Sequence, residues 1–113
     1  MTIGEIRWVD LPPRGGHAQS GRRPAIIVQS QRSLERIPTV LVIPLTSQLD
    51  ALRFPGTVLV EADSQNGLRR ASVALVFQLT ALDQRYLKDA LGKITTKVID
   101  EIWLAFDELV GRK

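Results

Sequence analysis

The residues of this chain best suited to chemistry lie in one stretch without a carboxylate, between Asp10 and Glu35. That stretch holds four of the arginines and the only histidine: Arg14, His17, Arg22, Arg23 and Arg32. Arginine carries a planar, permanently charged fork whose donors match the oxygens of a phosphate group. The glycine-rich part, 15–25, runs straight into the apolar residues 26–28, which predicts a cation-bearing loop held against a buried strand. We therefore expect an anion site, with phosphate as the first candidate.

The distribution of charge favours the same interpretation. Residues 1–57 carry seven arginines and four acids, and residues 58–113 carry eight residues of each sign, which gives a net charge of +3. The excess positive charge is thus confined to the first half, as in a localised footprint for a polyanion. The alternative is that these arginines only solvate the surface, and charge alone does not decide between the two.

Other chemistries have less support in the sequence. The chain lacks cysteine and has one histidine, so the usual zinc ligands are missing, and we expect no metal and no cofactor. No glycine-rich loop is followed by Gly-Lys-Ser/Thr, and no Gly-x-Ser-x-Gly motif occurs. The N-terminus does not resemble a signal peptide and no apolar run reaches the length of a membrane span, so we expect a cytoplasmic protein.

The pattern of apolar residues predicts a single domain over residues 1–113 that is mainly β with a C-terminal helix. Alternating and β-branched runs predict strands at 5–11, 25–29, 39–44, 57–61 and 72–79, and a shorter strand at 91–94. Polar residues and glycine at 63–67 predict a turn, and residues 83–90 favour a short helix before the last strand.

Over residues 98–110 the apolar period changes to that of a helix. Thr95 or Thr96 can cap the start of this helix, and Gly111 can end it. Its apolar face, which includes Trp103, is wider than one small sheet needs, so we expect part of it to pack against a second copy of the chain. Four acids share the opposite face, where solvation is the simplest interpretation and a metal site is the alternative: Asp100, Glu101, Asp107 and Glu108.

Two motifs carry more specific information, GGHAQSGRRPA at 15–25 and IPLTSQ at 43–48, where the third predicted strand ends. Together they resemble the MazF/PemK family of toxin endoribonucleases. The resemblance extends to GEIRWVDL at 4–11 and to SVALVFQL at 72–79 with ALD at 81–83, so it covers nearly the whole chain.

This resemblance implies an SH3-like, strongly bent β-barrel of about six to seven short strands (CcdB/PemK-like) with a C-terminal helix, assembled as a homodimer. It implies the toxin component of a toxin–antitoxin system, an mRNA interferase that cuts single-stranded RNA at short sequences without a metal. The nucleophile would be the substrate's own 2′-hydroxyl group. Besides RNA, the implied partner is a small antitoxin whose acidic and apolar tail occupies the RNA groove.

By the same resemblance, Arg23 matches the arginine of the family motif and Thr46 matches the active-site threonine, and both can contact one phosphate. The alternatives are a strand-end arginine paired with a surface acid and a threonine that forms a turn. Several family members place a glutamate directly before the glutamine of the loop, where this chain has Ala18. His17 is a candidate replacement as proton acceptor because histidine titrates near neutral pH; the alternative is an exposed loop residue.

We expect further RNA contacts from basic, amide and hydroxyl side chains in and around these motifs: Arg14, Gln19, Arg22, Arg32, Ser47, Gln48, Arg53 and Gln78. Arg53 stands beside Phe54 in the loop after Thr46, which offers a cation next to a ring on which a base can stack; a core position for Phe54 is the alternative. Two other functions stay open. One is a non-catalytic toxin of the same fold that poisons a protein such as a topoisomerase, and the other is an RNA-binding barrel that has lost catalysis.

Overall fold

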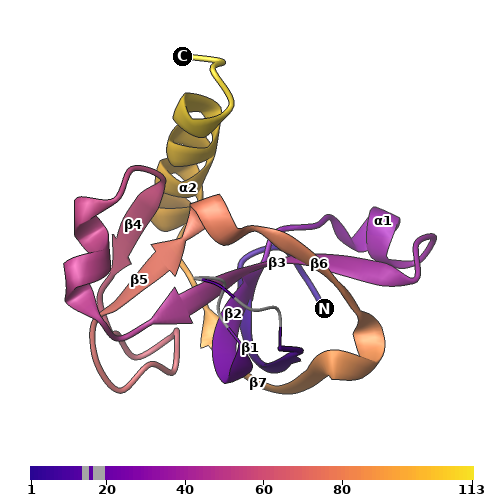
Figure 1. The fold of residues 1–113 in the computed structure, drawn as a ribbon. Coiled ribbons are helices and arrows are strands. Elements are labelled where there is room, and N and C mark those ends of the chain that lie inside the picture. The colour runs from indigo at the N-terminus through magenta and orange to yellow at the C-terminus, as the bar shows by residue number, and fades with distance from the viewer. Residues whose placement is uncertain (14–15, 17–19) are drawn as a thin grey trace.

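The computed structural model describes residues 1–13, 16 and 20–113 of the chain (Figure 1). The strands in this part are β1 (Glu5–Leu11), β2 (Gly21–Ile27), β3 (Thr39–Thr46), β4 (Thr57–Val60), β5 (Ser72–Leu75), β6 (Thr80–Asp83) and β7 (Leu87–Lys93). The α-helices are α1 (Gln31–Leu34) and α2 (Thr96–Leu109), and the short 3-10 helices are η1 (Leu49–Arg53), η2 (Val76–Gln78) and η3 (Gln84–Tyr86).

Strand β3 organises the sheet because it changes partner along its length. Its residues 39–42 pair with β6, residues 42–44 pair with β2, and Leu45 and Thr46 pair with β5. The strands follow the order β4-β5-β3-β2-β1-β7, with β6 beside β3, and every pair among the described strands is antiparallel. The path ends at β4 and β7, and no pairing within the described residues joins these two strands. The curved sheet is therefore open, and the expected bent barrel describes it only loosely.

Two hydrophobic clusters lie on opposite faces of strands β1 and β2. Ile6 and Ile26 belong to the first cluster, and Val9 and Ala25 belong to the second. Successive residues of a strand point to opposite faces, so both strands contribute to both clusters. Helix α2 covers the first cluster through Ile102, which is 1% exposed.

The C-terminal helix begins and ends at the residues that the sequence indicates. The side-chain oxygen of Thr95 accepts a hydrogen bond from the backbone N–H of Val98 at 3.3 Å, which caps the first turn. Gly111 follows the helix with a φ of +77°, in the left-handed region that glycine adopts without strain. In the described part of the chain, no helix is both long enough and apolar enough to cross a membrane.

The single strand predicted at 72–79 is wrong. Strand β5 ends at Leu75, η2 turns the chain through a corner, and β6 begins at Thr80. The two strands pair with different ends of β3, because Ala74 lies opposite Leu45 whereas Thr80 lies opposite Val42. An unbroken apolar run gives no signal for such a corner.

The short helix predicted at 83–90 is right only for one 3-10 turn, because strand β7 takes the place of the rest. Asp83 caps the single turn of η3 by accepting a hydrogen bond from the N–H of Arg85 at 2.9 Å, and the chain then enters β7. β7 pairs with β1 through two register shifts, so its side chains do not follow a simple alternation. This irregularity hides the strand in the sequence, where only 91–94 was expected to be extended.

Strand β2 begins at Gly21 rather than at Ala25, where the sequence pattern predicts its start. Arg22 lies opposite Asp10 and Arg23 lies opposite Val9, so the two arginines are strand residues and not part of a flexible loop. The glycine and the proline that flank them are uncommon in strands, which is why the sequence pattern favoured a loop.

Candidate active site

Strands β2 and β3 separate at one end, and this fork positions Arg23 and Thr46. The last paired positions of the two strands are Ala25 and Pro44. Beyond them β3 turns to β5, whereas β2 continues beside β1. Pro24 and Pro44 have no backbone N–H to donate at the place where the strands part. Arg23 and Thr46 each stand two residues beyond the last pair, so the register places them at equivalent positions on the two arms of the fork.

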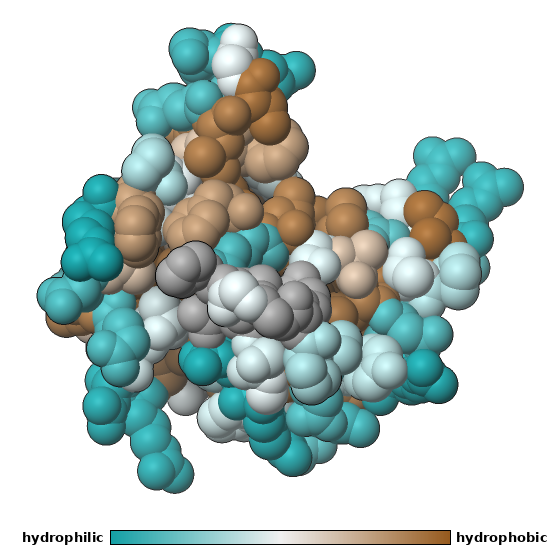
Figure 2. All heavy atoms as spheres, viewed as in Figure 1, coloured by the Kyte–Doolittle hydropathy of each residue, from teal (hydrophilic) through white to brown (hydrophobic). Residues whose placement is uncertain are grey.

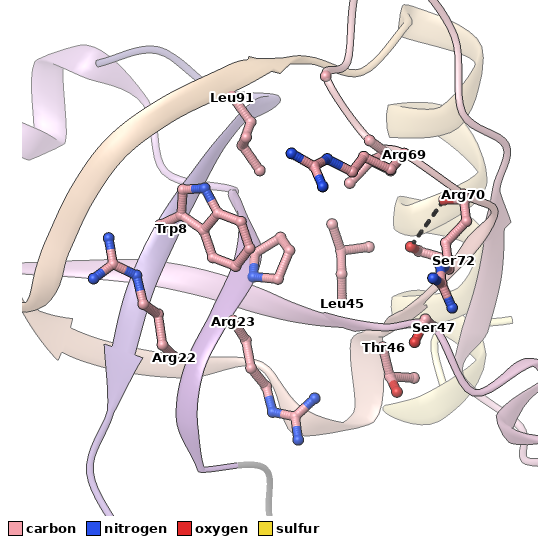
Figure 3. A pocket seen from close by; sticks show the side chains of 13 residues that line it. Trp8, Arg22, Arg23, Leu45, Thr46, Ser47, Arg69, Arg70, Ser72 and Leu91 are labelled. Carbon is pink, nitrogen blue, oxygen red and sulfur yellow. Dashed lines mark hydrogen bonds between the residues drawn. The ribbon is translucent and has the colours of Figure 1, made fainter.

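The fork opens into a cavity of about 480 Å³, which we call the arginine cavity (Figure 3). Its described wall comes from five strands and the segments after β3 and β4: Trp8, Arg22, Arg23, Pro24, Leu45, Thr46, Ser47, Gly67, Leu68, Arg69, Arg70, Ser72 and Leu91. This wall contains four arginines, three hydroxyl groups and no carboxylate.

The arginines of this cavity make no ion pair with any residue that the structure describes. Asp10 lies opposite Arg22 in the sheet but approaches the ammonium group of Lys88, at 3.8 Å. The Arg22 guanidinium instead lies over the ring of Trp8, 5.8 Å from its centre. Arg23 donates from Nε to the carbonyl of Ser20 at 3.0 Å, and no other described residue engages its two terminal nitrogens, which can therefore serve a ligand. The cavity is therefore strongly electropositive.

Thr46 supplies a hydroxyl group in a fixed orientation. It is 6% exposed, and its Oγ1 accepts a hydrogen bond from the backbone N–H of Gln48 at 3.2 Å. This bond uses a lone pair of the oxygen, so the hydroxyl hydrogen can be donated to an anionic oxygen in the cavity.

A second cavity, of about 530 Å³, shares Thr46 with the first. We call it the aromatic cavity, and its described lining is Thr46, Gln48, Ala51, Arg53, Phe54, Leu75, Phe77 and Gln78. The rings of Phe54 and Phe77 meet edge to face, with their centres 5.8 Å apart, and the Arg53 guanidinium lies 4.8 Å from the centre of the Phe54 ring. Phe54 is 45% exposed, so the alternative of a core position for it is wrong.

The residues chosen from the sequence fall into three groups in the structure. Arg22, Arg23, Thr46 and Ser47 line the arginine cavity, and Gln48, Arg53, Phe54 and Gln78 line the aromatic cavity together with Thr46. Arg32 lies in α1 and lines neither cavity, and its predicted contact with RNA stays a prediction. Arg14, His17 and Gln19 lie outside the described residues.

Sequence reasoning missed Trp8, Arg69 and Arg70. The two arginines belong to the half of the chain whose charges cancel, and that balance concealed them. The adjacent basic pair directly after the predicted turn at 63–67 was the available signal. Trp8 lies within a strand pattern and reads as a core residue, but it is only partly buried and lines the cavity.

The fold and the site together define a curved β-sheet protein whose electropositive cavity can hold a phosphodiester and stabilise added negative charge on it. The family model of the PemK-like, MazF-like toxins of type II toxin–antitoxin systems matches residues 2–110. The chain belongs to this family.

Individual proteins agree with this assignment along nearly the full chain. Endoribonuclease MazF of Staphylococcus saprophyticus is 32% identical over 111 residues, which are 98% of this chain and 92% of that protein. MazF (Form-I) from Deinococcus radiodurans has a similar structure, with a TM-score of 0.81 at 26% identity, covering 98% of this chain and 96% of that one. MazE-MazF (Form-II) from the same organism gives a TM-score of 0.75 at 24% identity over 100% of this chain and 97% of that one, which shows the shared fold.

Proposed function

We propose that this MazF-like toxin is an endoribonuclease that cleaves single-stranded RNA at short sequences, without a metal, through attack by the substrate's own 2′-hydroxyl group. One observation carries the proposal: Arg23 and Thr46 line the same cavity, whose described wall has four arginines and no carboxylate. The 32% identical relative named as an endoribonuclease supports the class of reaction.

In the proposed reaction the 2′-oxygen forms a bond to the adjacent phosphorus, and the bond from phosphorus to the 5′-oxygen of the next nucleotide breaks. The proton of the 2′-hydroxyl group passes to a base, and a proton is delivered to the departing 5′-oxygen. The products are a 2′,3′-cyclic phosphate end and a 5′-hydroxyl end. Because the nucleophile belongs to the substrate, the protein supplies only charge stabilisation and proton transfer.

Arg23 donates from its terminal nitrogens to the non-bridging oxygens while negative charge builds on the phosphorane. Thr46 donates its hydroxyl hydrogen to one of the same oxygens. Preorganised donors of this kind each accelerate a reaction by roughly 10²- to 10³-fold. A divalent cation would enter this wall against the repulsion of four guanidinium groups, so the charges of the site favour a metal-free reaction.

His17 is the proton acceptor in this proposal. Neither a guanidinium nor an aliphatic hydroxyl group exchanges protons readily near neutral pH, and Ala18 stands where several family members have a glutamate. Replacement of His17 by alanine is expected to change the pH dependence of the cleavage rate. An unchanged profile would remove His17 from the mechanism and leave the roles of Arg23 and Thr46 standing.

The aromatic cavity supports a single-stranded substrate. Bases that are not paired can stack on exposed rings, and such recognition is characteristic of proteins that bind single-stranded RNA. Phe54 offers such a ring beside the Arg53 cation, and Gln48 and Gln78 line the same cavity with amide groups. A base held there would lie next to Thr46, which both cavities share.

The proposed protein partner is a cognate antitoxin with an acidic and apolar tail. Its carboxylates would complement the arginine cavity, and its apolar side chains would suit the aromatic cavity. A similar fold occurs in the structure named MazE-MazF from Deinococcus radiodurans. A tail bound in this way would compete directly with RNA.

A homodimer is also part of the proposal. Helix α2 and the residue that caps its C-terminus expose four large apolar side chains, and Figure 2 shows apolar residues gathered along this helix. They are Trp103, Leu104, Leu109 and Val110. Sedimentation over a range of protein concentrations tests the dimer, and a monomer at all concentrations would contradict it.

The decisive experiment incubates the purified protein with a long single-stranded RNA in the presence and absence of a chelator, and then analyses the ends of the fragments. We expect cleavage that resists the chelator and fragments ending in a 2′,3′-cyclic or 3′-phosphate. Cleavage only when a divalent metal is present would overturn the metal-free mechanism. Binding without cleavage would favour the non-catalytic RNA-binding barrel, and neither binding nor cleavage would favour a toxin that acts on a protein.

A further inference from the structure

The segment between β4 and β5 is an ordered arm built around one buried amide. Asn66 is 1% exposed, and its Nδ2 donates to the carbonyl of Glu61 at 2.8 Å. Its Oδ1 accepts from the backbone N–H groups of Asp63 and Leu68, at 3.2 and 3.0 Å. The carboxylate of Asp63 in turn accepts from two backbone N–H groups of the turn, both at 2.8 Å. These bonds fix the backbone of the arm.

The arm is also held directly against β7, backbone to backbone. A Cβ atom added at Gly67 would lie 2.2 Å from the carbonyl oxygen of Leu91, and one added at Gly92 would lie 2.2 Å from the carbonyl oxygen of Gln65. The N–H of Lys93 donates to the same Gln65 oxygen at 3.0 Å. Only glycine permits this approach, so the position of the arm relative to the sheet is determined by close contact.

The arm carries Arg69 and Arg70 to the rim of the arginine cavity. Leu68 before them is partly buried against the first hydrophobic cluster, and the hydroxyl group of Ser72 after them donates to the carbonyl of Arg70 at 3.3 Å. In Figure 3 the Arg69 side chain extends across the cavity toward Trp8. The two arginines thus reach the cavity from the side opposite to β2, which carries Arg22 and Arg23.

We infer that Arg69 and Arg70 bind a second backbone phosphate of the RNA, next to the scissile one, and that the cavity holds the nucleoside between the two phosphates. This inference rests on the proposed function. Two observations carry it: the arginines lack ionic partners in the described structure, and they start from a fixed backbone on an element separate from the one that presents Arg23.

The size and lining of the cavity agree with a nucleotide as occupant. At about 480 Å³ the cavity falls within the range of about 300–1,000 Å³ that is usual for small-molecule sites. Apolar groups of Trp8, Leu45 and Leu91 form part of the wall between the two pairs of arginines (Figure 3), and Pro24 also lines the cavity. Such a surface can cover a base or ribose while guanidinium groups hold the phosphate on either side.

The test neutralises the RNA one phosphate at a time. A short RNA that binds the protein is made with a 2′-O-methyl group at every nucleotide to prevent cleavage, and each linkage in turn is replaced by an uncharged methylphosphonate. Affinity is measured for the unaltered protein, for Arg23→Gln and for the double variant Arg69→Gln/Arg70→Gln. A second double variant, Arg36→Gln/Lys97→Gln, removes two positive charges at exposed positions outside both cavities and serves as the control.

With the unaltered protein, two neighbouring linkages should each weaken binding by about 10- to 100-fold when neutralised. In the Arg69→Gln/Arg70→Gln variant, neutralising one of these two linkages should no longer weaken binding. In the Arg23→Gln variant, neutralising the other linkage should no longer weaken binding. The arm variant should also reduce the slope of log affinity against log salt concentration by about 0.7, the value for one phosphate contact to a single strand. In the Arg36→Gln/Lys97→Gln control, neutralising either linkage should still weaken binding.

Several outcomes would overturn the inference. One is that the unaltered protein responds to the neutralisation of a single linkage only. Another is that the Arg69→Gln/Arg70→Gln variant still responds at both linkages. A third is that the Arg36→Gln/Lys97→Gln control also stops responding at one linkage. RNA that does not bind at all would also overturn it. Because the readout is binding, the result is independent of the cleavage assay: a protein that cleaves RNA yet shows only one sensitive linkage refutes this inference and leaves the proposed function intact.

Discussion

Arg23 and Thr46 occupy matching places on the two arms of the β2–β3 fork, each two residues beyond the paired residues Ala25 and Pro44. They come from distant parts of the sequence, and the divergence of the strands leaves space between them. If β2 and β3 had stayed paired beyond Ala25 and Pro44, backbone hydrogen bonds between the two strands would have closed that space. The cavity at this position is therefore a consequence of strand pairing, and β3 creates it by leaving β2 for β5.

The first prediction concerns the two donors. Arg23→Gln and Thr46→Val are each expected to lower the cleavage rate at saturating RNA by roughly 10²- to 10³-fold, because each removes one donor to the charged phosphorane. Arg23→Lys should be nearly as slow as Arg23→Gln, since lysine lacks the planar fork of arginine. Thr46→Ser keeps the hydroxyl group and should retain most of the activity. Single-turnover kinetics measures the effect, and equal rates for the valine and serine variants would contradict the role of Thr46.

The second prediction separates stacking from charge in the aromatic cavity. Phe54→Leu is expected to weaken RNA binding by about 1–3 kcal/mol without changing its salt dependence, because stacking on a ring releases no counterions. Leu52→Ala is the control, since Leu52 lies in η1, directly before Arg53 and Phe54, and lines neither cavity. Titrations at several salt concentrations measure both quantities. A change in the salt slope for Phe54→Leu would show that the ring acts indirectly, through the position of Arg53.

The third prediction addresses the amide that organises the arm before β5. Asn66→Ala is expected to lower the free energy of unfolding by about 1–3 kcal/mol, because it leaves the carbonyl of Glu61 and two backbone N–H groups without their partner in a partly buried turn. The control is Gln65→Ala, at an exposed position next to it. Urea denaturation compares the two variants, and equal stability would show that water replaces the amide at no cost.

The fourth prediction tests the contact between the arm and β7. Gly92→Ala would place a Cβ atom 2.2 Å from the carbonyl oxygen of Gln65, so one backbone must move. Forced overpacking of this kind typically costs about 1–3 kcal/mol. Gly111→Ala is the comparison, because no atom lies within 4 Å of its added Cβ. Thermal unfolding should show a larger loss for Gly92→Ala, even though Gly111 has the positive φ.

Local patterns in the sequence predicted the regular elements well. The range 5–11 predicted for the first strand is the observed β1, and the capping residue Thr95 and the terminating Gly111 of α2 follow from rules that act within a few residues. The 72–79 and 83–90 predictions failed because corners, 3-10 turns and register shifts depend on distant pairing partners. The sequence resembles the family closely enough to single out Arg23 and Thr46.

The contribution of Arg69 and Arg70 was not predictable in the same way. Their side chains enter the cavity because Asn66, Gly67 and Gly92 hold the arm against β7. None of these three residues is itself basic or close in sequence to β2. The adjacent basic pair is visible in the sequence, but packing between remote segments leaves no periodic signal, so its place in the cavity comes only from the three-dimensional structure.

Thr46 forms part of the boundary between two unlike compartments, one cationic and one aromatic. A polynucleotide bound across this threonine, as proposed, would have its 5′ side in one compartment and its 3′ side in the other. Reversing the strand would exchange these environments. If the proposed RNA substrate lies across this boundary, the asymmetry would favour one strand polarity before any individual base is read.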